Sequence, residues 1–258
     1  MKTIILAGGW GTCMGPLAEL VPKPMVAIGG KPIIWHIMKI YSYYGYNDFV
    51  IALGVKGDVI KEYFYSFESL NNDFTVNMAS GEITYHNKHN ESQWKVTLVD
   101  TGINTLKGGR IKKVESYLDD DINMVTYGDG LADIDINALV NFHKSHDKTV
   151  TFTGVHPSGR FGEFKEVDNR VITFQEKPNR GQAFINGGYM VFNRNLLNYL
   201  SIDKDCDLEF GIFEKLAKKG EVMVYKHEGS WECMDYECDV KYLNQLWYDG
   251  KSFWKKWR

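Results

Sequence analysis

The chain has 258 residues, of which 44% are hydrophobic and 24% charged, a composition typical of a globular protein with a sizeable core. Its formal net charge of −3 argues against a dedicated nucleic-acid-binding protein, which usually carries a basic patch. No apolar stretch approaches the roughly 20 residues of a membrane span, and the four cysteines form no CxxC pair, so we expect a cytoplasmic protein with free thiols and no membrane partner.

The first half of the chain alternates short apolar strands with amphipathic helices. Strands are predicted over 3–7, 48–53, 94–99 and 122–127, and helices from Lys31-Pro32 onward and over 58–64, 111–118 and 135–145. This order predicts an α/β fold with a Rossmann-like, mixed but mostly parallel sheet and helices on both faces.

The second half is richer in short strands, predicted over 149–155, 164–167, 171–175, from Ile185 onward and over 221–225. Amphipathic helices are predicted over 208–219, ended by Gly220, and over 240–248. Because no linker or repeat interrupts the chain, we expect a single domain over 1–258, with a small β-rich C-terminal subdomain from about residue 150.

A glycine-rich segment, GGWGT at 8–12, follows the first predicted strand. Glycines there let backbone N–H groups approach a polyphosphate, although the spacing fits neither GxGxxG nor a Walker A loop, and a tight turn is the alternative. Lys23 follows between two prolines that keep the backbone extended. We interpret Lys23 as a phosphate ligand near the glycines, against the alternative of a solvated surface lysine.

Asp129 sits between two glycines at the end of the strand predicted over 122–127. Open α/β sheets bind ligands at this end of their strands, and a carboxylate there suits a divalent metal, with a simple turn aspartate as the alternative. Asp235 is a second candidate metal ligand. Further along, QEKP at 175–178 and INGGY at 185–189 place an acid, a base and an amide where they could hold sugar hydroxyls and a phosphate. His36 lies within a predicted helix and is interpreted as structural.

Taken in order, LAGGWGT, PKPM, GDG, FQEKP, INGGYMVF and WECMD resemble the sugar-1-phosphate nucleotidyltransferase family. WHIMKIYSYYGYNDFVIALGVKGDVIKEYF, VTLVDTG, KGGRIKKV, TYGDGLADIDI and LWYDGKSFWKKW resemble its cytidylyltransferase branch, so the resemblance covers nearly the whole chain. It implies that an oxygen of a sugar 1-phosphate, expected to be glucose 1-phosphate, attacks the α-phosphorus of CTP in line. Pyrophosphate leaves and a CDP-sugar for polysaccharide biosynthesis is formed.

The same resemblance implies roles for individual residues. Asp129 and Asp235 would hold Mg²⁺ and, with Lys23, form the catalytic set. Residues 150–258 would supply acceptor-binding and oligomerisation elements of a homo-oligomer. The nucleotide would contact Leu6, Ala7, Gly8, Gly9, Gly11, Thr12, Lys23, Arg110 and Gly128. The acceptor would contact Tyr127, Glu176, Lys177, Asn186 and Gly188, with Glu176 on the sugar hydroxyls and Lys177 on the phosphate.

The aromatic C-terminal tail allows two interpretations. Its composition favours a segment docked on its own chain, with solvated lysines. The resemblance instead implies a subunit contact through Trp247, Phe253, Trp254 and Trp257.

One position departs from the family pattern. The family's glycine loop ends in GTR, whereas this chain has Cys13 in place of the arginine, and the acidic SEET stretch is replaced by Gly15-Pro16-Leu17-Ala18. A thiol cannot make the bidentate phosphate contacts of a guanidinium. Three possibilities stay open: another cation such as Arg110 or a lysine substitutes, the phosphorylated acceptor differs, or the protein is a weakly active paralogue that binds nucleotide sugars.

Overall fold

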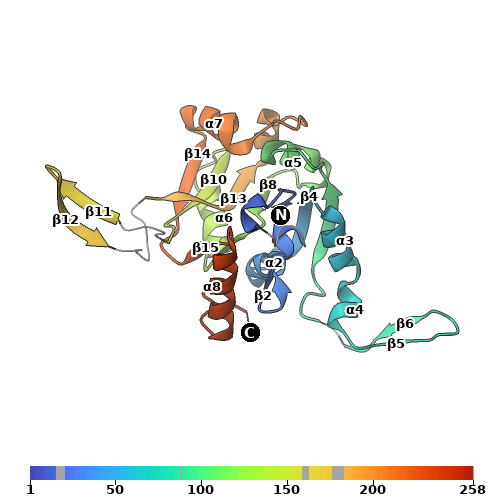
Figure 1. Cartoon of the computed structure of the whole chain (residues 1–258). Helices are drawn as coiled ribbons and strands as arrows, with labels where there is room; N and C mark the ends of the chain where they lie inside the picture. Colours follow the sequence, from blue (N-terminus) through green and yellow to red (C-terminus); the bar gives the residue numbers. More distant parts are fainter. Residues whose placement is uncertain (16–20, 88, 159–162, 176–182, 258) are drawn as a thin grey trace.

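A computed structural model describes residues 1–15, 21–87, 89–158, 163–175 and 183–257 (Figure 1). Its centre is a seven-stranded sheet with the order β14-β10-β13-β8-β1-β4-β7. The strands are β1 (Thr3–Ala7), β4 (Asp48–Leu53), β7 (Lys95–Asp100), β8 (Ile122–Tyr127), β10 (Val150–Val155), β13 (Ile185–Asn193) and β14 (Val222–Lys226). Strands β8, β1, β4 and β7 are parallel, as are β10 and β14, whereas β13 runs antiparallel to β8 and β10. The predicted mixed, mostly parallel sheet is confirmed.

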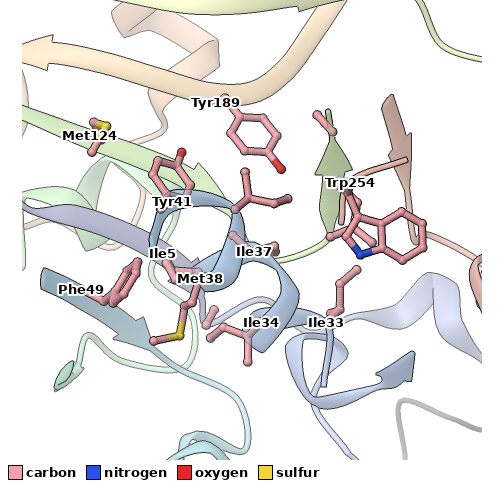
Figure 2. Close-up of a cluster of buried hydrophobic side chains, with 14 of the residues drawn as sticks. Ile5, Ile33, Ile34, Ile37, Met38, Tyr41, Phe49, Met124, Tyr189 and Trp254 are labelled. Carbon is pink, nitrogen blue, oxygen red and sulfur yellow. The ribbon is translucent and has the colours of Figure 1, made fainter. Parts of the chain in front are cut away.

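Alternate residues of the central strands enter two separate hydrophobic clusters, one on each face of the sheet. In β1, for example, Ile5 belongs to one cluster and Ile4 to the other. The first cluster is covered by α2 (Ile33–Tyr43), α3 (Gly57–Tyr65), α6 (Ile136–Lys144) and α8 (Glu237–Tyr248), and Figure 2 shows its centre. The second is covered by α5 (Lys107–Lys113), η4 (Arg194–Tyr199), η5 (Leu208–Phe213) and α7 (Glu214–Lys218). The predicted helices on both faces are therefore confirmed.

In two predicted helices, glycines account for the difference between the prediction and the structure. The helix predicted over 111–118 begins at Lys107, because the two glycines that follow do not break it. A Cβ at Gly108 would lie 2.8 Å from Sγ of Cys206, so this glycine allows a close approach of two segments. The helix predicted over 208–219 is interrupted at Gly211, whose φ of 94° is not helical.

Most C-terminal strands extend the central sheet, so the β-rich C-terminal region is confirmed but shares the main core. Strands β11 (Glu163–Val167) and β12 (Arg170–Gln175) pair only with each other, through an Asp168-Asn169 turn with φ of 53° and 64°. Short pairs are formed by β9 (Gly130–Ala132) with β15 (Trp231–Cys233) and by β2 (Ala27–Ile28) with β3 (Lys31–Pro32). The remaining helices within the described residues are η1 (Thr12–Met14), η2 (Lys23–Met25), α4 (Phe67–Asn71) and η3 (Glu115–Tyr117).

A hairpin of β5 (Phe74–Val76) and β6 (Ile83–Tyr85) was not predicted. It extends away from the body of the molecule next to α4 (Figure 1). None of the described helices is long and apolar enough to cross a bilayer.

The aromatic tail is docked on its own chain, as its composition indicated. Trp254 is completely buried in the first cluster, which also contains Ile33 and Ile37 of α2 (Figure 2). Its indole Nε1 donates to Nδ1 of His36 at 3.3 Å, and the structural interpretation of His36 is confirmed. The expected subunit contact through Trp254 is wrong, because this side chain has no exposed surface to offer a partner.

Candidate active site

Neighbouring parallel strands bring the candidate residues to one edge of the sheet. Leu6 of β1 pairs with Tyr127 of β8, so the segments that follow both strands leave the sheet side by side. A Cβ at Gly128 would lie 3.0 Å from the carbonyl oxygen of Leu6 and 3.0 Å from Cγ of Pro24. The glycine therefore allows the PKPM segment to pack between the two strand ends.

Each glycine of the first loop lacks a side chain for a different structural reason. Gly11 has a φ of 64°, which disfavours other residues, and a Cβ there would lie 3.3 Å from Cβ of Lys23. A Cβ at Gly8 would lie 2.1 Å from Nη1 of Arg110. Gly9 meets nothing and opens onto a cavity of about 340 Å³. The cavity is lined by Gly9, Trp10, Ile103, Asn104, Thr105, Leu106, Lys107 and Arg110.

Lys23 joins the glycine loop to both candidate metal ligands. Its Nζ lies 2.7 Å from Oδ2 of Asp129 and 2.6 Å from Oδ1 of Asp235, while the lysine side chain is only 14% exposed. Burial acts to lower the pKa of Lys23, but the two carboxylates outweigh it and raise the pKa above its ordinary value. Lys23 therefore carries a full positive charge between two anions, and the surface-lysine alternative is wrong.

The two aspartates are held by the pairing of β9 with β15. Cys233 pairs with Gly130, and the backbone N–H of Met234 donates to the carbonyl oxygen of Asp129 at 2.9 Å. One carboxylate oxygen each of Asp129 and Asp235 and Sγ of Cys233 lie within 4.8 Å of one another. The carboxylates of Asp129 and Asp235 are hard oxygen donors of the kind that Mg²⁺ prefers. The residues present therefore fit a divalent cation.

A second group of polar residues surrounds the end of β8. The hydroxyl of Tyr127 donates to a carboxylate oxygen of Glu209 and accepts from Nδ2 of Asn186 at 3.1 Å. Gly188 has a φ of 85°, its N–H donates to Oδ1 of Asn186 at 3.0 Å, and a Cβ there would lie 2.6 Å from the Tyr127 ring. Burial, reinforced by Glu209, raises the pKa of Tyr127 well above its ordinary value, so the phenol keeps its proton.

Arg110 is placed beneath the glycine loop. It is 4% exposed, and its guanidinium donates to the carbonyl oxygens of Leu53, Gly8, Gly102 and Ile103 and to the hydroxyl of Thr101, at 2.7–3.1 Å. Burial lowers its pKa from the ordinary value. Because these acceptors occupy the guanidinium in this structure, a direct contact of Arg110 with a nucleotide stays a prediction.

The structure brings together most of the residues that the sequence singled out. Leu6 and Ala7 end β1, and Gly8 to Thr12 follow beside Lys23 and Gly128. Cys13 is exposed in η1. Glu176, Lys177 and part of the altered 13–20 loop lie outside the described residues.

Sequence reasoning missed three residues at this site. Glu209 bonds to Tyr127 across 82 positions in sequence, and Lys107 lies 2.8 Å from Oε2 of Glu209. Cys233 lies beside both aspartates. Of the three, only Cys233 carried a sequence signal, because it lies within the WECMD motif two residues before Asp235.

Comparison with known proteins gives the family. The nucleotidyl transferase family model matches residues 2–250. A glucose-1-phosphate cytidylyltransferase of Salmonella typhi is 47% identical over 259 residues, covering 100% of both chains. The crystal structure of HddC from Yersinia pseudotuberculosis has a TM-score of 0.70 at 21% identity, covering 95% of this chain and 99% of that one. The inositol-1-phosphate CTP transferase of T. maritima has a TM-score of 0.67 at 16% identity, covering 99% of this chain and 96% of that one. These two likenesses support the fold alone, whereas the family model and the full-length relative establish that this chain belongs to the nucleotidyl transferase family.

Proposed function

We propose that this protein is a cytidylyltransferase that converts CTP and glucose 1-phosphate to CDP-glucose and pyrophosphate, in the cytoplasm, as a step of polysaccharide biosynthesis. The observation that carries the proposal is the bridge that Lys23 forms between Asp129 and Asp235 beside the glycine loop. The full-length relative supports CTP and glucose 1-phosphate as the substrates.

The glycine loop holds the triphosphate in this proposal. Backbone N–H groups of Gly8, Gly9, Gly11 and Thr12 can approach phosphate oxygens closely, because the three glycines have no Cβ to obstruct them. Lys23 approaches Gly11 of this loop through its Cβ and backbone N, and its ammonium stays protonated, so Lys23 would contribute a fixed positive charge next to the phosphates. The neighbouring cavity is of the size and apolar character that suit a nucleotide base.

Asp129 and Asp235 would hold Mg²⁺, which when bound neutralises negative charge that develops on the phosphate oxygens. The protein's own contribution is positioning: the β9–β15 pairing fixes both carboxylates, and no covalent intermediate is needed. Leu6, Ala7 and Gly128 are proposed, from the family resemblance, to contact the nucleotide.

The acceptor would lie against Tyr127, Asn186 and Gly188. The Tyr127 phenol is protonated and its orientation is fixed by Glu209 and Asn186, which gives a rigid polar surface for sugar hydroxyls. Glu176 and Lys177 are proposed, from the family resemblance, to hold the sugar hydroxyls and the phosphate. In-line attack needs only that the acceptor phosphate oxygen be held close to the α-phosphorus.

The test is product identification from the purified protein. Each of CTP, UTP, GTP, dTTP and ATP is incubated with glucose 1-phosphate and Mg²⁺, with pyrophosphate release and product mass as readouts. We expect release with CTP and the mass of CDP-glucose. No release with any nucleotide contradicts the proposed reaction, and release with another nucleotide alone contradicts the choice of CTP.

Cys13 favours a second candidate, in which the same chemistry acts on another phosphorylated acceptor. An exposed thiol stands where the family has an arginine that could bind phosphate. A panel of sugar phosphates and polyol phosphates at fixed CTP separates the two. A higher kcat/KM for an acceptor other than glucose 1-phosphate supports this candidate.

The β5–β6 hairpin supports the proposed homo-oligomer. Phe74 pairs with Tyr85 and Val76 with Ile83, so four apolar side chains share one face, and all four are exposed. An isolated two-stranded hairpin is marginally stable in water, so we propose that this face packs on a second copy. Light scattering should give a multiple of 29.6 kDa, reduced by Val76→Asp with Ile83→Asp. A monomeric wild type contradicts this assembly.

A further inference from the structure

The proposed metal site contains a sulfur atom. Sγ of Cys233 and one carboxylate oxygen each from Asp129 and Asp235 lie within 4.8 Å of one another. Among the residues that the structure describes, this is the one group of three or more acidic, histidine or cysteine side chains with such spacing. Lys23 already places a cation between the two carboxylates, at 2.7 and 2.6 Å, so the position is one that a positive charge can occupy.

The backbone explains why the three side chains meet. Cys233 is the last residue of β15 (Trp231–Cys233), and Asp235 follows two residues later, so both lie at the end of the strand that pairs with β9. Asp129 precedes β9, the strand that pairs with β15, and its carbonyl accepts from the N–H of Met234 between them. The pairing of β9 with β15 therefore brings Asp129 and Asp235, which flank the two strands, close to Cys233.

The donor set differs from that of a pure magnesium site. Mg²⁺ prefers oxygen ligands, whereas Zn²⁺, Co²⁺ and Cd²⁺ also bind thiolates strongly. We infer that Cys233 is a third ligand of the metal site, so that the protein takes up thiophilic divalent ions through Asp129, Cys233 and Asp235. The inference rests on the proposed metal role of the two aspartates and extends it to a soft ligand.

The binding step balances without any oxidant or reductant. The divalent ion forms bonds to one oxygen of each aspartate and to Sγ, the S–H bond of Cys233 breaks, and its proton passes to solvent. The ammonium of Lys23 leaves the position between the carboxylates and keeps its own proton. Inhibition of the enzyme by thiophilic ions follows, since an ion held by sulfur in this position keeps Mg²⁺ out.

The experiment uses Cd²⁺ as the probe, with the full chain carrying Cys13→Ser and Cys238→Ser to remove the two exposed thiols. Ultraviolet absorption reports sulfur-to-cadmium charge transfer, and calorimetry gives the affinity. We expect a band that saturates at one ion per chain. Cys233→Ser should abolish the band and weaken Cd²⁺ binding by at least about 10-fold, a loss that even outer-shell partners of metal sites can cause.

Two further variants show whether the band arises from sulfur and carboxylate at this one site. Cys206→Ser removes the other thiol, which packs near Gly108, and should leave the band unchanged. Asp129→Asn keeps every thiol and should weaken Cd²⁺ binding if sulfur and carboxylate act together. A band that survives Cys233→Ser, or an affinity unchanged by Asp129→Asn, overturns the three-ligand site.

A cadmium-113 NMR spectrum of the parent protein provides a readout that needs no change at Cys233. A thiolate ligand shifts the resonance strongly downfield of an all-oxygen site, and a resonance in the all-oxygen range overturns the inference. Turnover of CTP and glucose 1-phosphate with Mg²⁺ is measured separately. A band without turnover refutes the proposed function alone, and turnover without a band refutes the role of Cys233 alone.

Discussion

Replacing Arg110 by methionine should destabilise the fold and loosen the nucleotide loop together. The side chain is 4% exposed, and Nη1 and Nη2 donate to four carbonyl oxygens and the hydroxyl of Thr101. Methionine retains much of the aliphatic length but donates nothing, so these acceptors lose a charged donor. Each such bond contributes roughly 1.5–3 kcal/mol, but the bonds are not additive. We therefore expect a loss of about 3–5 kcal/mol, because several buried neutral acceptors are left without a donor at roughly 1–3 kcal/mol each.

Urea denaturation gives this loss directly as a change in the free energy of unfolding. Because Gly8 is one of the acceptors, the KM for CTP should also rise, whereas Lys218→Met, at an exposed position of α7, should change neither quantity. Arg110→Lys should be intermediate, since an ammonium keeps the charge but cannot span acceptors on several segments. An Arg110→Met protein within about 1 kcal/mol of the wild type, with an unchanged KM, would refute the proposed role of Arg110 in holding the loop.

Three other changes test the site and the core. Lys23→Met should lower kcat/KM by about 10²–10³-fold, because it removes the fixed cation at the phosphates, and an unchanged rate in steady-state kinetics would contradict this role. Burial lowers the pKa of His36 from 6.5 to about 4, so between these pH values only the unfolded chain is protonated there. The free energy of unfolding should therefore fall by roughly 3 kcal/mol as pH drops through this window. His36→Gln should make the free energy of unfolding depend less steeply on pH. Equal pH dependence of the two proteins in urea titrations would show that His36 is not the cause. Trp254→Ala should cost about 3–5 kcal/mol in the same assay, because the ring is fully buried, and a loss below about 1 kcal/mol would show that the tail is dispensable.

The buried strands could be predicted well because burial on both faces gives a clear sequence pattern. Strands β1, β4 and β8 have neighbours on both sides and clusters on both faces, so they are short apolar runs with clear ends. The β5–β6 hairpin has no such pattern. Its apolar residues are exposed on this chain, and nothing along the sequence indicates what they would contact.

Glycines were the most ambiguous signal. Gly108 resembles a helix breaker but lies inside α5, where the absence of a Cβ lets Cys206 approach. Gly211 lies within a helical pattern but interrupts it with a positive φ. In both cases the outcome depends on a distant segment or on a backbone angle that the local pattern does not contain.

The candidate site was predictable in its members and less so in its contacts. Lys23, Asp129 and Asp235 could be chosen from motifs, but their direct ion pairing could not be read from residues so far apart in sequence. Glu209 lies in none of the motifs, and Cys233 lies within WECMD but is not marked by it as a ligand. They become visible only when the ends of β8 and β15 are placed in space.

The ion pairs of Lys23 also set the order in which the site can form during synthesis. Lys23 bridges 106 positions to Asp129 and 212 positions to Asp235, and α8 reinforces the second link through hydrogen bonds of Asn244 with Gly29 and Ala27. A growing chain can pair β1, β4 and β8 long before residue 235 leaves the ribosome. Until residue 235 has been synthesised, Lys23 can pair with Asp129 alone. The complete site therefore requires that the C-terminal segment close on the N-terminal loop.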